Sequence, residues 1–363
     1  VHLPALPGVY PNPDPHMALV FPAVPISGQL TTGPEAAEFA YFMSGSEPAN
    51  SLPLHVERVG DALGRDEGTI FRRQGGGIDM NGLTFAEQRP SQIPIVVLDT
   101  ETTGLKPHLG NRVVEIAAVR LENWERVAEF SRLIQPERPM DPEAAAINGI
   151  YDRDLIGQPV FTAVADELLA FMDGALLVAH NAAFDAGFVG QEFYIAGYAA
   201  QHAPGEPVLP QPWLCTLELA RRHFYFGKNN LGHIARQLGV RVGRAHRALT
   251  DVYTTAEILK RMARDLEKKR LHTVADLLHA QGGPIYTPPA PVTAVPPLIT
   301  QAIAQKQQLR IRYRSQSGEA LRRISPRFVT EGEGAAYLIA YCHERQAQRT
   351  FRLDKIFDVE LLG

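Results

Sequence analysis

The chain has 363 residues, which exceeds a typical single domain, so its length predicts two or three folded units that each bury a core. Hydrophobic residues make up 45% of the chain and charged residues 21%, a composition typical of soluble globular proteins. The formal net charge of −4 excludes a chain that attracts polyanions through its overall charge, so nucleic-acid binding would need local basic patches or metal ions.

Cysteine use and hydropathy predict the compartment. Cys215 and Cys342 lie far apart without metal-ligand spacing, which argues against a disulfide framework or a zinc site and favours a reducing cytosol. No apolar run is long enough to span a bilayer. Residues 1–25 lack the basic and then apolar segments of a secretory signal. We therefore expect a cytoplasmic protein with no membrane partner.

The N-terminal quarter carries few structural signals. Residues 1–27 contain seven prolines, which disfavour regular helix and predict an extended or disordered arm. Residues 28–92 form a segment to which the sequence assigns no role. Three glycines at 75–77 favour a flexible loop over a phosphate-binding turn, because no Lys-Ser/Thr pair follows them.

Strand and helix patterns fill residues 93–265. Three strand-like runs at 95–98, 113–121 and 127–134, with a short turn at 123–126, predict an antiparallel meander. Asp141 followed by proline predicts a helix start, since aspartate accepts hydrogen bonds from free amides. The other expected elements are helices at 162–172, 182–196, 214–222 and 231–238 and a buried strand at 175–179. This order predicts an α/β fold with a mixed sheet flanked by helices.

Two acids end the first of these strands. Asp99 and Glu101 follow an apolar run, and residues two apart on a strand point to the same side. Like charges so close together are costly unless a cation neutralises them, and carboxylate oxygens suit Mg²⁺ or Mn²⁺. Taken alone, the stretch favours the simpler interpretation of a strand that runs into an acidic turn.

Two later stretches change that interpretation, one from His180 to Asp185 and one from His246 to Asp251. Together with residues 96–105 they resemble the three motifs of the DEDD-type 3′-to-5′ exonucleases, in the subclass with a histidine five residues before the last aspartate. The likeness covers residues 93–265 and extends to the proofreading exonuclease subunit of bacterial replicative DNA polymerases. It implies a ribonuclease H-like fold.

The resemblance implies a site for two Mg²⁺ or Mn²⁺ ions that hydrolyses phosphodiesters. Asp99 would bridge the ions, Glu101 and Asp251 would complete the site beside the attacking water, and Asp185 would hold the second ion. Taken singly, Asp185 also fits a helix N-cap, and Asp251 a surface acid.

His246 is the expected general base. It precedes Asp251 by five residues, about 500° of helical rotation, so the two cannot share a face of one helix and His246 is expected in the preceding loop. There the ordinary histidine pKa near 6.5 suits a general base, although a solvent-facing loop histidine is the plain alternative. The resemblance places Thr102 and Leu105 against the terminal nucleotide, with Leu105 as an apolar wedge between the last two bases, and Asn181 and Phe184 are candidates to line the same pocket. Core or turn packing explains each of these four equally well.

The C-terminal third begins with a helix end and a proline-rich linker at 266–297, whose six prolines from 284 onwards predict a segment unable to pack. Residues 298–363 are expected to form a small β-rich domain. The expected elements are a helix at 299–308 and strands at 309–314, 321–329, 336–342 and 350–359. This domain resembles a WYL domain, a regulatory or ligand-binding module, through Tyr313, Arg323, Pro326, residues 337–342 and residues 349–356, although Ala336 stands where the name-giving tryptophan would be.

A basic strand face is expected in this domain. Arg310, Arg312 and Arg314 alternate with apolar residues, so they share one side of their strand. From residue 301 onwards the chain has 11 basic and 7 acidic side chains, an excess opposite in sign to that of the whole chain. The face predicts either a nucleic-acid patch or a solvated strand face.

The leading functional hypothesis is a metal-dependent 3′-5′ exonuclease that acts on DNA in repair or processing. Its expected partner is nucleic acid, preferably single-stranded DNA with a free 3′ end, and the sequence identifies no protein partner. One alternative is an exoribonuclease that trims RNA 3′ ends, because the motifs do not distinguish the sugar. Another is a regulator that senses a ligand through the WYL-like domain. The complete set of acids argues against that second alternative.

Overall fold

A computed structural model describes the backbone of residues 8–11, 17–20 and 70–71, and residues 85–198, 206–240, 247–316 and 318–362 in full. Contacts divide the chain into two compact units, Val1–Thr84 and Phe85–Gly363. In the first unit, β1 (Gly8–Pro11) pairs antiparallel with β2 (Met17–Val20) and parallel with β3 (Ile70–Phe71). Two of these strands lie in the expected proline-rich arm. They are extended, as the prolines predict, and they pair, which the prolines do not predict. The three glycines at 75–77 lie outside the described residues.

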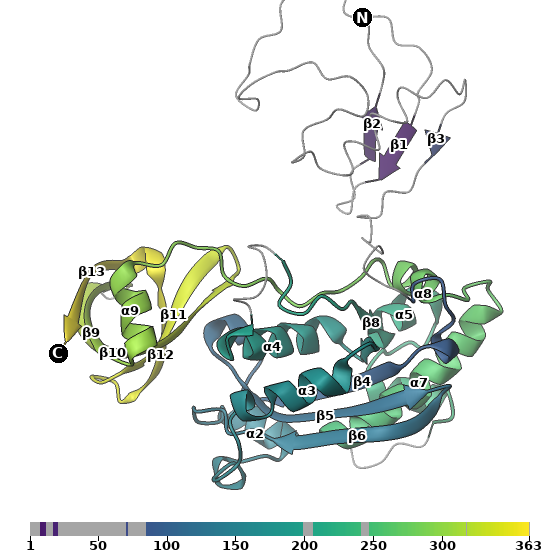
Figure 1. The fold of residues 1–363 in the computed structure, drawn as a ribbon, viewed down its shortest axis with the longest axis horizontal. Coiled ribbons are helices and arrows are strands. Elements are labelled where there is room, and N and C mark those ends of the chain that lie inside the picture. Colours follow the sequence, from purple (N-terminus) through teal and green to yellow (C-terminus); the bar gives the residue numbers. More distant parts are fainter. Residues whose placement is uncertain are drawn as a thin grey trace, which may run out of the picture. The chain divides into compact units, whose positions relative to one another are not determined.

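The second unit contains the mixed sheet that the sequence predicts (Figure 1). Its strands, in spatial order, are β6 (Glu125–Leu133), β5 (Val113–Glu122), β4 (Ile95–Thr102), β7 (Leu176–Ala179) and β8 (Trp213–Cys215). β4, β5 and β6 form the expected antiparallel meander, whereas β4, β7 and β8 run parallel. β4 is the central strand: residues 95–97 pair with both β5 and β7, and the end of the strand continues in pairing with β5 as far as Thr102.

Helices flank this sheet: α2 (Pro142–Asn148), α3 (Ala165–Met172), α4 (Ala182–Ile195), α5 (Thr216–His223), α6 (Leu231–Gln237), α7 (Ala248–Glu267) and α8 (Val274–Ala280). α7 packs on β4 and β5, and α4 packs on β4, β5, β7 and β8. The apolar run of β7 is fully buried in a core with Phe161, Phe188 and Trp213. The predicted α/β fold of ribonuclease H-like type is therefore confirmed. Among the described helices, none is long and apolar enough to cross a membrane.

The expected helix at 214–222 begins late. Leu214 and Cys215 belong to β8, where Leu214 pairs with Val178, and α5 starts at Thr216. Pairing with a buried parallel strand outweighs the helix preference of a leucine in so short a segment. The prediction was wrong at its first two residues for that reason.

The C-terminal domain is a five-stranded antiparallel sheet with one helix against it (Figure 1). Its elements are α9 (Pro297–Gln305), β9 (Gln308–Ser315), β10 (Gly318–Gly332), β11 (Ala335–Cys342), β12 (Ala347–Arg352) and β13 (Ile356–Leu362), and the strand order is β12-β11-β10-β9-β13. The single strand expected at 350–359 is two strands, because a 3-10 turn at Leu353–Lys355 interrupts it. α9 stops at Gln305, three residues before its expected end, because Lys306 adopts a left-handed φ of 54°.

The proline-rich segment before α9 packs closely, so the expectation that it cannot pack was wrong. The carbonyl of Ile285 accepts a hydrogen bond from Trp213 N at 2.7 Å, and Thr287 Oγ1 accepts one from Leu209 N at 2.8 Å. Just before it, the Gln281 amide accepts from Cys215 N at 2.6 Å and donates to Trp213 O at 2.9 Å. An extended segment keeps its carbonyls available, and here they cover the edge of β8. The predicted boundaries of the exonuclease and WYL-like domains stay predictions.

Candidate active site

Three carboxylates converge where β4 meets α7. Asp99 and Glu101 lie two residues apart on β4, so both point to one side of the sheet. Asp251 lies in the first turn of α7, which packs on that strand. One oxygen from each of the three carboxylates lies within 4.8 Å of the other two. The structure thus brings together three of the four acids that the sequence singles out as metal ligands.

The fourth acid, Asp185, approaches β4 from another helix. It lies in the first turn of α4 and is 3% exposed. Its Oδ1 accepts hydrogen bonds from Thr100 N at 3.0 Å and from Thr100 Oγ1 at 2.9 Å. Thr100 lies between Asp99 and Glu101, so these bonds tie α4 to the middle of the acidic strand end.

Burial and mutual repulsion raise the pKa values of these acids. The pKa of Asp99 lies well above its usual range, because the carboxyl is buried and faces Asp185 and Glu101. Burial, and then the charge of Glu115, raise the pKa of Glu101 to about 7. Burial also raises the pKa of Asp185 to about 7, although the bonds from Thr100 oppose that rise. A divalent cation would relieve this repulsion, and the donors are the hard oxygens that such cations prefer, so the residues fit a divalent metal.

Glu115 is a fifth acid, which the sequence reasoning missed. It lies opposite Glu101 on β5 and is 2% exposed. It forms an ion pair with Arg247 at 2.9 Å and accepts a bond from Ala248 N at 3.3 Å, so it anchors the start of α7 and thereby Asp251. The available signal was a lone acid within the apolar run 113–119, where an unpaired charge would be costly.

The two histidines of the motifs differ. His246 lies outside the described residues, so its role as general base stays a prediction. His180 follows β7, and its Nδ1 lies 2.9 Å from Thr216 Oγ1 while its Nε2 lies 3.0 Å from Asn229 O. Burial lowers the pKa of His180. Both ring nitrogens therefore serve to join β7 to the chain around α5.

The four predicted substrate contacts fall into two groups. Leu105 is 78% exposed, and Asn181 is exposed at the N-cap position of α4. Thr102 is buried, and its hydroxyl donates to Gly104 O at 2.6 Å. The half-buried Phe184 packs on the ring of Phe188, with 4.8 Å between the ring centroids. The first pair is accessible to a ligand, whereas the second pair holds a turn and the core.

The predicted basic row on β9 has the expected orientation. Arg310, Arg312 and Arg314 are exposed, while Leu309 and Ile311, which alternate with them, are buried. Two of the arginines have carboxylate partners: Arg310 pairs with Glu360 at 2.9 Å, and Arg314 pairs with Glu319 at 2.6 Å. These pairs offset part of the positive charge that the sequence count suggests.

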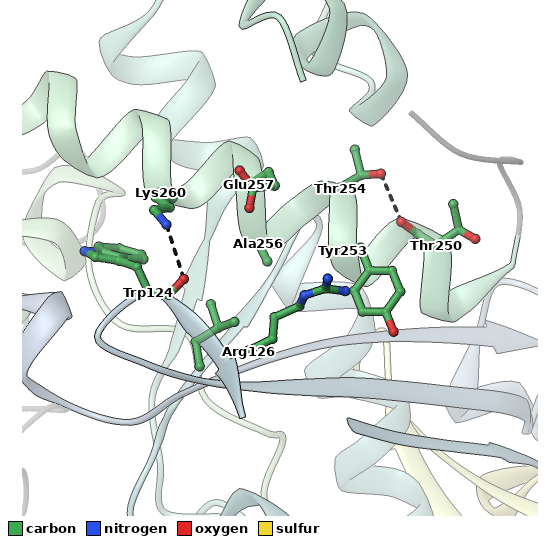
Figure 2. Close-up of a pocket in the computed structure, with 9 residues that line it drawn as sticks. Trp124, Arg126, Thr250, Tyr253, Thr254, Ala256, Glu257 and Lys260 are labelled. Carbon is green, nitrogen blue, oxygen red and sulfur yellow. Dashed lines mark hydrogen bonds between the residues drawn. The ribbon is translucent and has the colours of Figure 1, made fainter. Parts of the chain in front are cut away.

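A hollow of about 350 Å³ lies beside α7 (Figure 2). It is lined by Leu121, Trp124, Arg126, Thr250, Tyr253, Thr254, Ala256, Glu257 and Lys260. The Arg126 guanidinium lies 4.5 Å from the centroid of the Tyr253 ring, and Lys260 Nζ donates to Trp124 O at 3.3 Å. None of the predicted metal ligands lines it, so the acids form a separate site.

Comparison with known proteins finds two family models that match this chain. The RNase_T family model, described as Exonuclease, matches residues 96–259, and the WYL domain model matches residues 295–361. The DNA polymerase III subunit epsilon of Salmonella typhimurium is 35% identical over 170 residues, which cover 45% of this chain and 68% of that protein. The 3′-5′ exonuclease DinG of Bacillus subtilis is 34% identical over 196 residues, which cover 51% of this chain and 20% of that protein.

Other matched proteins share only a part of their length with this chain or have a low TM-score to it. The chain spans only 12% to 27% of the length of five curated relatives. The solved structure of Exonuclease X in complex with 5′ overhanging duplex DNA is 27% identical with a TM-score of 0.41, covering 52% of this chain and 99% of that one. The match to the epsilon subunit and the match to the exonuclease model show that the chain belongs to the DEDD-type 3′-5′ exonuclease family. The match to the WYL model shows a WYL domain at its C-terminal side.

Proposed function

We propose that the protein is a metal-dependent 3′-5′ exonuclease that hydrolyses phosphodiester bonds at the 3′ end of single-stranded DNA. The observation that carries this proposal is the convergence of Asp99, Glu101 and Asp251 within 4.8 Å in a chain of the exonuclease family. The raised pKa values of Asp99 and Glu101 support it, because they indicate negative charge that the protein itself does not offset.

In this mechanism the acids would hold two Mg²⁺ or Mn²⁺ ions. Bound ions of this kind neutralise the scissile phosphate and make water a better nucleophile. Asp99, Glu101 and Asp251 would form one side of the metal site, and Asp185, fixed by Thr100, would form the other. His246 would accept the proton of the attacking water as general base.

The accessible side chains beside this site would bind the terminal nucleotide. Leu105 would insert between the last two bases, and Asn181 would contact the nucleotide from the start of α4. Thr102 and Phe184 would shape the same pocket from beneath, through the turn and the core contact that they make. A role in DNA repair or processing, in the cytoplasm, is part of the proposal.

RNA is the alternative substrate, because the motif residues do not by themselves specify the sugar. The arginine row of β9 would add a phosphate-binding surface for a longer strand, although the pairing of Arg310 and Arg314 with glutamates reduces its expected strength. A pure ligand sensor is the less favoured alternative, since it has no need of converging acids.

The decisive experiment compares 3′-labelled and 5′-labelled single-stranded DNA and RNA of one sequence, with Mg²⁺, Mn²⁺ or a chelator. We expect mononucleotide release from the 3′ end of DNA with either ion and no cleavage with the chelator. Preference for RNA would establish the exoribonuclease alternative. A protein that cleaves neither strand with either ion would refute the proposal.

A further inference from the structure

The sheet of the WYL domain has two buried faces. On one face Val329, Leu338 and Phe351 pack with α9. Side chains alternate along a strand, so the neighbours of these residues point to the other face. That second face carries Phe328, Thr330, Ile339, Gln348 and Thr350, which we call the docking face. Phe328 is 7% exposed and Ile339 is 0% exposed, so something other than α9 covers them.

The loop that follows β4 covers the docking face. This loop contains the 3-10 turn η3 (Pro107–Leu109). Three successive backbone carbonyls accept hydrogen bonds from the docking face: His108 O from Thr330 Oγ1 at 2.6 Å, Leu109 O from Thr350 Oγ1 at 2.9 Å, and Gly110 O from Gln348 Nε2 at 3.2 Å. Three bonds to consecutive carbonyls fix the position of the loop backbone.

The contact is close on both sides. Gly110 has a φ of +87°, and a Cβ there would lie 3.0 Å from Ile339 Cγ2 and from Gln348 Nε2. A Cβ at Gly332 would lie 2.5 Å from the His108 ring. The absence of a side chain at each glycine lets the two backbones approach. At the rim, Lys106 Nζ lies 2.7 Å from Glu333 Oε1.

The same loop begins at the acid site. It leaves β4 just after Glu101, and Thr103 N donates to Arg112 O at 2.8 Å, which ties the two ends of the loop together. Asn111 and Asp141 leave no room for a side chain at Gly104. Along the chain, Leu105 lies between this anchor and the carbonyls bound by the docking face, and it is 78% exposed. A shift of the WYL sheet would therefore move the backbone that carries Leu105.

We propose that the docking face positions Leu105 for the terminal nucleotide, so that the WYL domain sets the affinity of the active site for a 3′ end. Thr330, Gln348 and Thr350 are then positioning residues. This inference rests on the proposed exonuclease function. A loop held in its binding conformation loses less conformational freedom when substrate binds. We therefore expect these contacts to lower KM and to leave kcat unchanged.

The test uses the full chain with 3′-labelled single-stranded DNA at saturating Mg²⁺ or Mn²⁺. Thr350→Val removes the hydroxyl donor at nearly constant volume, and Thr330→Val with Thr350→Val removes two donors. We expect KM to rise about tenfold in the double variant, with kcat and the half-saturating metal concentration within about twofold of wild type. Thr350→Ser keeps the donor and should behave as wild type. Thr300→Val on the exposed side of α9 is the matched control and should also behave as wild type.

A second comparison separates positioning from simple destabilisation. In a Leu105→Ala background, Thr350→Val should raise KM no further, because the residue that it positions is absent. If the double valine variant does not fold, Glu333→Lys at the exposed rim should raise KM, and adding Lys106→Glu should restore it.

Two results would overturn the inference. One is a wild-type KM in folded Thr350→Val. The other is a change in kcat and metal half-saturation at constant KM, which would place the effect at the metal ligands. Failure of the wild-type protein to trim any 3′ end would instead refute the proposed function, and this inference with it.

Discussion

The acid site and the arginine row differ in how far neighbouring groups of opposite charge offset their like charges. At the acid site, Asp99 and Glu101 have raised pKa values, and Arg247, which pairs with Glu115, lowers the pKa of Glu101 less than burial and the neighbouring acids raise it. On β9, Arg310 and Arg314 each pair with a glutamate of a neighbouring strand. Acids whose charge no neighbouring group offsets indicate a site for a bound cation. Arginines that pair with surface glutamates are typical of an ordinary solvent-exposed sheet face. The comparison predicts large effects at the acids and small ones at the arginines.

The largest effect is expected for Asp99→Asn and Asp251→Asn. Each removes one anionic ligand while it keeps the size of the side chain, so nuclease activity should fall by at least about 10³-fold. The fold should persist, because the change relieves repulsion. Initial rates and circular dichroism check both statements, with Asp265→Asn on the far end of α7 as control. Full activity of Asp99→Asn in metal-supplemented buffer would refute the site.

A smaller but still large effect is expected for His246→Ala. Loss of a general base should slow the chemical step by about 10² to 10⁴ with little change in KM. The acidic limb of the pH-rate profile should disappear with it. A mutant that keeps this limb would show that another group accepts the proton.

The metal-free protein should lose stability as the pH rises. Glu101 and Asp185 have pKa values of about 7 when folded, against ordinary values of 4.5 and 3.8. Their contribution is therefore fully present below about pH 4 and is lost as the pH rises towards 7. With a chelator, the Tm of wild type should fall across this range relative to that of Asp185→Asn.

The comparison with Asp185→Asn is needed because carboxyls with a lowered pKa, such as Asp276, change stability in the opposite sense. Adding Mg²⁺ or Mn²⁺ at pH 7.5 should restore the Tm of wild type more than that of the variant. Parallel Tm curves for the two proteins would contradict the uncompensated charge at the acid site.

The smallest effect is expected at the arginine row. Replacing Arg310, Arg312 and Arg314 together by glutamine should weaken binding of a long single strand only a few-fold and should slightly flatten its salt dependence. Deleting the whole WYL domain is a poorer test, because it also removes the docking face. Gel shifts at several salt concentrations measure the difference, with Arg345→Gln in the turn after β11 as control. An unchanged salt slope would make the row a solvated strand face.

Periodic and short-range features were predictable from the sequence. The apolar run before Asp99 predicted β4, and the order of the strand and helix patterns predicted the mixed sheet. The two-residue spacing of Asp99 and Glu101 also placed both acids on one side of the strand. These features depend on neighbouring residues and on the period of a strand or helix, and both can be read from the sequence itself.

Long-range contacts were not predictable in this way. The bonds that Thr100 donates to Asp185 and that Arg247 donates to Glu115 join residues far apart in sequence. In the sequence, the residues of the docking face do not differ from those of an ordinary strand, because Phe328 and Ile339 are apolar like core residues. Their partner is a loop more than 200 positions earlier, and no local pattern records that pairing.

The covering of β8 has a consequence for how the two domains can be separated. An unpaired strand edge invites pairing with another chain, and here the Gln281 amide and the Ile285 carbonyl occupy the edge. The segment that leads to the WYL domain therefore also protects the edge of the exonuclease sheet from pairing with another chain. An exonuclease fragment ended at residue 265 would lack this segment and would uncover the edge of β8. Such a fragment should keep its acids and yet associate with itself, so its solubility would depend on residues that take no part in catalysis.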